Sequence, residues 1–305
     1  MLITRLLFVL FIQNVVAANA QTITIIAANT KETLPFATIQ NLTAQWTQVG
    51  SENGVFTFTE ANSKAGDSIL ISYTGYLPLR LVKPKVGITL NMEPLPYLLQ
   101  LVEVLPCKGN KKVVLRNYQK NKSDWGLGSN EDALSSWAAY IPNTSKVRGI
   151  IISIHYTLNM SSTPKNGRTA PFKIRLLRYN ETTNLPGDPL LYKELLVYPT
   201  GQKVEIDVRN EWLRMPENGL VIVIDYFYAG EQYVHTHKVK QFKIDGSSID
   251  TIHKSYGASI KAVRADNMIG KGFMFQYKRN EWNTLNNSQN QKLAPKIELS
   301  LKLCD

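Results

Sequence analysis

The sequence lacks the short motifs that mark common catalytic sites. It contains no nucleophile elbow, no phosphate-binding glycine loop and no metalloprotease helix motif. We therefore expect a protein that is not an enzyme and that holds no cofactor. Paired carboxylates for glycoside hydrolysis remain open, because their separation is set only in three dimensions. The acidic residues Glu205, Asp207 and Asp225 lie where strand patterning already accounts for them.

Long apolar runs are also missing, except at the amino terminus. Arg5 provides a positive charge there, residues 6–12 are apolar, and Ala18-Asn19-Ala20 reads as a small-residue cleavage site. The apolar stretch is shorter than the ~20 residues of a membrane-spanning helix. Residues 1–20 are therefore predicted to be a signal peptide, cleaved after Ala20. With no cysteine near this point and no later apolar run, we expect an exported, soluble protein without a lipid anchor or transmembrane span.

Helical periodicity is sparse, whereas strand-like alternation of apolar and polar residues recurs along the chain, so the fold class is predicted to be all-β. In residues 147–158 the even positions are apolar, and Ser153, His155 and Thr157 are predicted to point outward. Residues 220–228 are apolar on both faces apart from Asp225, which indicates a central strand. Other strands are expected at 172–176, 204–208, 273–277 and 297–303, with shorter ones near Val113 and Ala138. About eight strands in this second region favour a jelly-roll-like sandwich.

One connected β pattern occupies the first region: residues 34–39 (LPFATI), 51–56 (SENGVF) and 65–76 (AGDSILISYTGY). Pro35 is expected at the entry to an edge strand, Asn53-Gly54 in a tight hairpin turn, and Gly66-Asp67 in a further turn. Residues Ile69, Ile71 and Tyr73 would share one face. In order and spacing this segment resembles the carboxypeptidase regulatory-like domain of exported Gram-negative bacterial proteins. That resemblance implies a transthyretin-like Greek-key sandwich without catalytic residues, and an address in the periplasm or at the outer-membrane surface.

Four segments follow from these patterns. They are the signal peptide (1–20), the regulatory-like sandwich (21–105), a linker with a first edge segment (106–132), and a jelly-roll-like sandwich (133–305). Residues 99–105 resemble the closing strand of the regulatory-like family. The second half is similar to sandwich segments that follow this domain in exported bacterial proteins of unknown role, a resemblance carried by residues 140–143, 185–188, 216–219 and 255–257.

Positive charge is concentrated in the second half. Residues 21–105 contain five Lys or Arg against six Asp or Glu, whereas residues 106–305 contain 29 against 18 and carry a net charge of +11. Such a surface favours acidic partners such as anionic glycans or lipopolysaccharide, although dispersed lysines also serve simply to keep a protein soluble. An exported chain without a compact basic–aromatic motif is not expected to bind nucleic acid.

Histidines and tryptophans supply the candidate surface residues. The segment 229–271 is long for a connection between core strands, and it contains His235, His237 and His253. A metal site would need a third ligand such as His253 or Asp225 beside the His235–His237 pair, and solvent-exposed histidines are the alternative. Exposed tryptophans can form a sugar-binding platform, or each can close one end of a sandwich. The four candidates are Trp125, Trp137, Trp212 and Trp282.

The two cysteines, Cys107 and Cys304, are predicted to form a disulfide. The periplasm is oxidising, and the first and last strands of a sandwich often lie close together. Two free thiols are the alternative, because Cys304 has the parity of Glu298, Ser300 and Lys302 and so faces away from the core.

The sequence thus favours a non-catalytic exported structural or binding protein, with an unidentified protein or glycan of the cell envelope as its partner. The alternative is a carbohydrate-binding or carbohydrate-active protein with its site on the second sandwich. Two carboxylates and a tryptophan in one cleft would favour that alternative.

Overall fold

The computed structural model describes residues 21–304 except 60–62, 83–86, 97–110, 120–124, 131–134, 161–162, 164, 243–247, 277–280 and 287–290. Over these residues the protein is all-β, as predicted, and its only helical segments are short 3₁₀ turns. Those turns are η1 (Lys165–Thr169), η2 (Arg209–Glu211), η3 (Glu231–Tyr233) and η4 (Ala265–Asn267). No helix in the described part of the chain is long and apolar enough to cross a membrane. The predicted signal peptide and the predicted closing strand at 99–105 lie outside the described residues.

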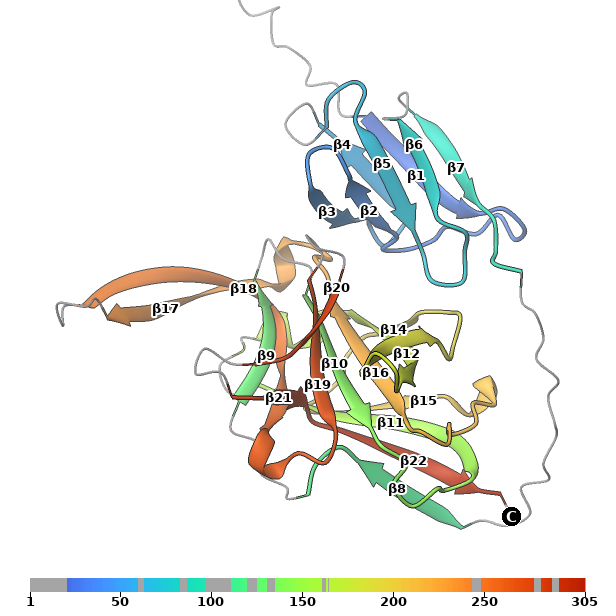
Figure 1. Cartoon of the computed structure of the whole chain (residues 1–305). Coiled ribbons are helices and arrows are strands. Elements are labelled where there is room, and N and C mark those ends of the chain that lie inside the picture. The colour runs from blue at the N-terminus through green and yellow to red at the C-terminus, as the bar shows by residue number, and fades with distance from the viewer. Residues whose placement is uncertain are drawn as a thin grey trace, which may run out of the picture.

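The amino-terminal part consists of two small sheets around one core (Figure 1). Its strands are β1 (Gln21–Ala27), β2 (Thr38–Asn41), β3 (Trp46–Val49), β4 (Val55–Phe58), β5 (Ser68–Ser72), β6 (Leu79–Val82) and β7 (Ile88–Met92). One sheet has the order β4-β1-β7 and the other β3-β2-β5-β6. Alternate residues point into the core, so Ile69 and Ile71 are fully buried on one face, with Tyr73 packed against the same cluster.

Two turn predictions in this part are corrected. Pro35 lies in a turn before β2, and β2 is an inner strand between β3 and β5 rather than an edge strand. The Asn53-Gly54 turn joins β3 of one sheet to β4 of the other, so it is not a hairpin. Of these two turn residues only Gly54 has a positive φ, 70°. A Cβ atom at Gly54 would lie 2.9 Å from the Ile25 carbonyl oxygen, so this turn has no room for a side chain.

The second part is a larger pair of sheets with its own core. The first sheet contains β10 (Ser135–Ile141), β12 (Phe172–Asn180), β13 (Leu185–Pro189), β14 (Leu195–Val197), β16 (Leu220–Tyr226), β19 (Lys271–Gln276) and β20 (Glu281–Thr284). Every residue of β16 is buried, and β16 lies between β12 and β10, which confirms the predicted central strand. Its polar residue Asp225 accepts hydrogen bonds from Ser136 and Arg175, so the buried carboxylate is compensated.

The second sheet of this part carries the candidate site. Its strands are β8 (Lys112–Arg116), β9 (Trp125–Asn130), β11 (Gly149–Asn159), β15 (Lys203–Asp207), β17 (Val234–Phe242), β18 (Ser248–Arg264), β21 (Leu293–Pro295) and β22 (Ile297–Leu303). The order is β17-β18-β11-β22-β8, with β15 paired to β11. In the described residues the first of these sheets has 7 strands and the second has 8. The expectation of about eight strands for this whole region was therefore too low.

A β-bulge in β11 changes which residues face the core. Opposite β22, Ile151 pairs with Leu301 but Ser153 pairs with Ser300, so Ile152 is an extra residue. Ile151, Ile154, Tyr156 and Leu158 are buried in the core, whereas Ile152 lies on the outer face. The predicted apolar face at even positions is therefore right beyond the bulge and wrong for Ile150 and Ile152 before it.

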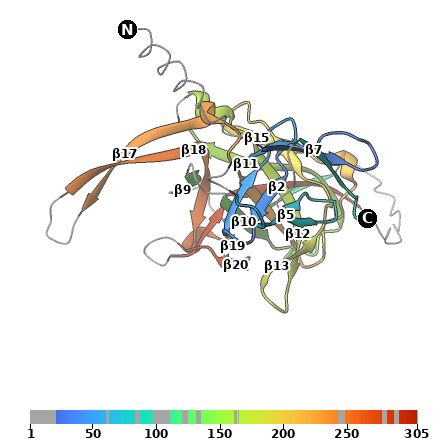
Figure 2. The same ribbon diagram turned by 90° about the horizontal axis from the view of Figure 1, so that it is seen from above.

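The segment 229–271, expected to be a long connection between core strands, is mostly a two-stranded arm. Strands β17 and β18 pair from Val234–Tyr256 to Phe242–Ser248. Both views show this hairpin projecting from the body of the second part (Figures 1 and 2). The arm exposes Ile249 and Ile252.

Candidate functional site

An open cavity of about 620 Å³ lies on the outer face of the second sheet. Its size falls within the range of small-molecule sites, and all but one of its lining side chains are polar or charged. The lining residues come from β8, β11, β15, β22 and η2, and they are Lys112, Ile152, Ser153, Glu205, Asp207, Arg209, Ser300 and Lys302. Because outward residues recur at every second position of a strand, pairing of β15, β11 and β22 brings their polar sides together.

The bulge in β11 shapes this cavity. It turns Ile152 outward and leaves Ser153, which is 5% exposed, beside Asp207 and Ser300 in register. The main chain around the extra residue is tied down, because the Ile152 carbonyl oxygen accepts a hydrogen bond from the Val208 amide at 3.0 Å. Bulges are frequent at sites where a strand must re-aim a side chain.

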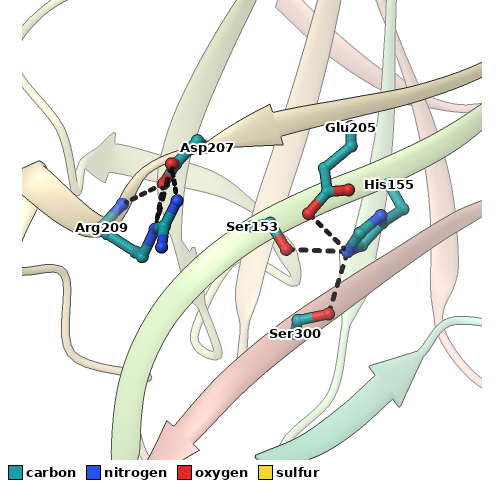
Figure 3. A network of polar contacts seen from close by, with 6 residues as sticks. All are labelled: Ser153, His155, Glu205, Asp207, Arg209 and Ser300. Carbon is teal, nitrogen blue, oxygen red and sulfur yellow. Dashed lines mark hydrogen bonds and ion pairs between the residues drawn. The ribbon is translucent and has the colours of Figure 1, made fainter.

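His155 is the centre of a polar network in the site (Figure 3). Its Nε2 atom lies 2.8 Å from the Ser153 Oγ and 2.9 Å from the Ser300 Oγ. The Glu205 Oε1 atom is 4.0 Å from the same nitrogen. In a Ser-His-Asp triad the acid would instead orient the opposite ring nitrogen, Nδ1. These residues are therefore arranged as a fixed patch of hydrogen-bonding groups and not as a triad. The prediction that His155 lies on the polar face with Ser153 is confirmed.

Asp207 is held by Arg209 in a second, separate group of contacts beside the His155 network (Figure 3). The Arg209 Nε donates to the Asp207 carboxylate at 2.9 and 3.0 Å, and the Arg209 backbone amide donates to it at 3.0 Å. These hydrogen bonds to the charged form lower the pKa of Asp207 to about 2. Asp207 is therefore ionised at neutral pH and unsuited to donate a proton to a leaving group.

A loop carrying an exposed tryptophan borders the cavity. Residues 208–213 form a loop whose two ends are hydrogen-bonded to β11. The Val208 amide donates to the Ile152 carbonyl, and the Leu213 carbonyl accepts a hydrogen bond from the Ile151 amide at 2.8 Å. Arg209, near the start of this loop, lines the cavity, and Trp212 near its end is 73% exposed. Trp212 has a φ of 50°, the left-handed region that a bulky residue rarely adopts. Such strained positions cluster at functional sites.

Two of the other candidate tryptophans, Trp137 and Trp282, are not exposed platforms. Trp137 is half-buried, and its Nε1 donates to the Gly128 carbonyl at 3.1 Å. Trp282 is also half-buried and packs edge-on against Phe275, with ring centroids 5.1 Å apart. Both rings are therefore partly covered by neighbouring residues. The side chain of Trp125 lies outside what the structure describes.

The candidate histidines lie on the arm and not in the cavity. Register places His237 directly opposite His253, and His235 opposite Ser255. The structure describes the side chains of His235 and His253, both half-buried, but not that of His237. Among the described side chains, no group of three His, Cys, Asp or Glu residues could hold a metal. Asp225, the other proposed ligand, is on β16 of the opposite sheet and paired with Arg175.

Of the two cysteines, only Cys304 lies in the described part of the chain, where no cysteine is free. Cys107 lies outside the described residues, so the pairing of Cys107 with Cys304 stays a prediction.

Comparison with known proteins does not place the chain in a family. No family model matches it, and no curated protein sequence matches it. One solved structure with some likeness is described as a "putative carbohydrate binding protein" from Bacteroides uniformis. The match has a TM-score of 0.20 and 8% identity, and it covers 79% of this chain and 97% of that one. At so low a TM-score the match carries no functional assignment, and the function proposed below rests on the cavity.

Most of the site could not be located from sequence. The outward parity of Ser153, His155, Ser300 and Lys302 was visible in the alternation of their strands, but their convergence with Glu205 depends on which strands pair. Glu205 and Asp207 do lie on a strand, as their patterning predicts, but that pattern does not show that both also line the cavity. The bulge at Ile152 has no sequence signal such as a glycine.

Proposed function

We propose that the protein is an exported, non-catalytic binding protein whose cavity on the second sheet holds a polar glycan. The observation that carries this is the lining of the cavity, which combines serine hydroxyls with fixed charges. The His155 imidazole behind this lining is hydrogen-bonded to both serines, and the loop that contributes Arg209 also carries the exposed Trp212. Sugars present both hydroxyl groups and apolar C–H faces, so they match hydrogen-bonding groups next to an aromatic ring.

The amino-terminal sandwich fits the same proposal as a carrier module. Its resemblance to the carboxypeptidase regulatory-like domain suggests a transthyretin-like sandwich without chemistry of its own, and the second part would be a binding sandwich of jelly-roll type. The predicted leader would deliver both to the periplasm or the outer-membrane surface. Mass spectrometry of the native protein should then find a mature chain beginning at Gln21, and a chain retaining Met1 in the cytoplasm would contradict export.

The binding proposal is tested by screening the mature chain on a glycan array and measuring hits by calorimetry. Trp212→Ala should weaken binding about fivefold or more, because about 1 kcal/mol is expected from an aromatic contact. Tyr228→Ala is the matched control, since Tyr228 is also an exposed aromatic but does not lie on the loop that contributes Arg209 to the cavity. The proposal fails if no glycan binds, or if both variants bind as the parent does.

A glycoside hydrolase at the same site is the second candidate, favoured by the presence of Glu205 and Asp207 in one cavity. Because the low pKa of Asp207 keeps it ionised, Glu205 would have to act as the acid. Release of reducing sugar from a bound glycan, abolished in Glu205→Gln, would establish hydrolysis. Binding without release would leave the non-catalytic proposal.

A further inference from the structure

Two lysines face each other at one end of the cavity. Lys302 of β22 pairs directly with Lys112 of β8, and both line the cavity. Directly opposed residues on antiparallel strands have Cα atoms about 5 Å apart. Like charges in such a pair destabilise a sheet. The repulsion between Lys112 and Lys302 would be relieved by an anion bound between them.

The same row across the sheet continues with a third positive charge. Ile150 of β11 is the other neighbour of Lys302, and Arg214 forms an isolated bridge with Ile150. Leu213 and Met215 on either side of Arg214 are buried, so Arg214 itself faces outward and is exposed. The row therefore reads Arg214, Ile150, Lys302, Lys112 from strand to strand.

The acidic groups nearby are already engaged elsewhere. Glu298 pairs with Arg116 at 3.3 Å, Asp207 is held by Arg209, and Glu205 lies beside His155. Within the described residues, Lys112, Lys302 and Arg214 form no ion pair. Among the described residues, this end of the cavity therefore carries positive charge that no ion pair compensates, and Glu205 lies two outward-facing residue rows further along the lining.

We infer that Lys112 and Lys302, the lysine end of the cavity, bind the acidic group of an anionic glycan, a carboxylate or a sulfate ester, with Arg214 adding positive charge further along the same row. The inference rests on the proposed glycan-binding function and names its ligand class. Ser300 is two residues from Lys302 on the same face, about 7 Å along the strand. One charged sugar residue can therefore place its anion between the lysines and its hydroxyl groups against Ser300 and Ser153. The anion would remove the repulsion between Lys112 and Lys302.

The test measures binding of the mature chain to three oligosaccharides of equal length by calorimetry: a uronic acid oligomer, a sulfated oligomer and a neutral oligomer. An acidic oligomer should bind at least about tenfold tighter than the neutral one, as expected from one or more charge-assisted hydrogen bonds. The preference for the acidic oligomer over the neutral one should shrink as the salt concentration rises from about 50 to about 500 mM, because salt screens the attraction between exposed charges. Preference for the uronic acid or for the sulfated oligomer supports the inference and identifies the group.

Paired variants separate a site from general charge. Lys112→Gln/Lys302→Gln should lose the acidic preference while still binding the neutral oligomer. Lys31→Gln/Lys165→Gln removes the same charge from exposed lysines outside the cavity lining and should keep the preference. Equal binding of acidic and neutral oligomers, or equal loss in both double variants, overturns the inference and leaves the glycan-binding proposal standing. Binding of none of the three, together with an empty array, overturns both.

Discussion

The Lys173 ammonium group donates a hydrogen bond to the Phe36 carbonyl oxygen at 2.6 Å, and this contact joins the two sandwiches. Lys173 lies on β12 of the second part, and Phe36 precedes β2 of the first. The Phe36 ring packs on Phe227 with centroids 4.6 Å apart, and Phe36 has a φ of 56°. The strained turn thus places both a ring and a carbonyl against the second sandwich.

Glu194 completes this junction. It forms an ion pair with Lys173 at 2.5 Å and accepts a hydrogen bond from the Thr74 hydroxyl at 2.8 Å. Both side chains of the ion pair are more than nine-tenths buried. A buried pair contributes little net stability against an apolar substitute, but removing one partner leaves an uncompensated charge. The junction therefore specifies one arrangement of the two parts.

Lys173→Ala should accordingly lower the free energy of unfolding by about 3–5 kcal/mol, measured by urea denaturation at pH 7. Lys146→Ala is the control, because the Lys146–Glu217 pair is exposed and is expected to contribute less than about 1 kcal/mol. Equal stability of the two variants would contradict a structural role for the buried pair.

The lowered pKa of Asp225 makes the stability of the protein depend on pH. Burial alone would raise its pKa, but the charge and hydrogen bonds of Arg175, with a hydrogen bond from Ser136, outweigh this and hold the pKa below its usual range. A carboxyl group with a lowered folded pKa stabilises the fold above its unfolded pKa, about 3.9. That contribution is lost as pH falls below about 4 through the folded pKa.

The measurement is a series of urea unfolding curves for the parent and Asp225→Asn between pH 7 and pH 3. At pH 7 the variant should be about 3 kcal/mol less stable, because Arg175 loses its ion pair with the buried carboxylate of Asp225. The difference between the two proteins should narrow below pH 4. A difference that stays constant across the series would show that Asp225 does not carry this pH dependence.

Strand patterning was informative wherever one face of a strand is buried. The alternation in Ile297, Leu299 and Leu301 predicts their burial, and all three are fully buried. The same alternation predicts that Ser300 and Lys302, between these apolar residues, point to the outer face of the sheet. Neither pattern contains the strand order, because alternation is identical whichever neighbour a strand pairs with. Long-range pairing of β8, β11, β15 and β22 is what creates the cavity, and it is encoded only in how the two cores pack.

Local exceptions also escaped the pattern. Because of the extra residue in β11, Ile150 and Ile152 face outward and not into the core as the alternation predicts. Periodicity alone cannot detect such an insertion. The length of the segment 229–271 sets it apart from an ordinary connection, but its sequence does not show that β17 and β18 pair with each other as an arm. In contrast, glycine marks its special positions directly, since Gly54, Gly66 and Gly75 all have a positive φ.

Gly54→Val should destabilise the amino-terminal sandwich by at least about 1–2 kcal/mol, the penalty for a side chain in the left-handed region. The clash with the Ile25 carbonyl oxygen at 2.9 Å adds to it. Gly87→Val is a matched control, because Gly87 also has a positive φ, 69°, but a Cβ atom there would meet nothing within 4 Å. Comparing the two by thermal unfolding separates backbone strain from the clash. A Gly54→Val protein as stable as the parent would contradict the observed turn.

The final prediction is the disulfide between Cys107 and Cys304. Lys112 pairs with Lys302, and the Leu303 amide donates to the Lys111 carbonyl at 3.0 Å, so the chain entering β8 runs beside the end of β22. Cys107 is four residues before Lys111, close enough for the chain to bring it to Cys304. Because the closed loop spans most of the second part, the bond should contribute up to ~5 kcal/mol in the chain-entropy model. Thiol titration of the denatured, unreduced protein should find no reactive thiol per chain, and two reactive thiols would rule the bond out. Cys304→Ser should then lower the melting temperature as far as reduction of the parent does, since each removes the same cross-link between the domain boundary and the last strand.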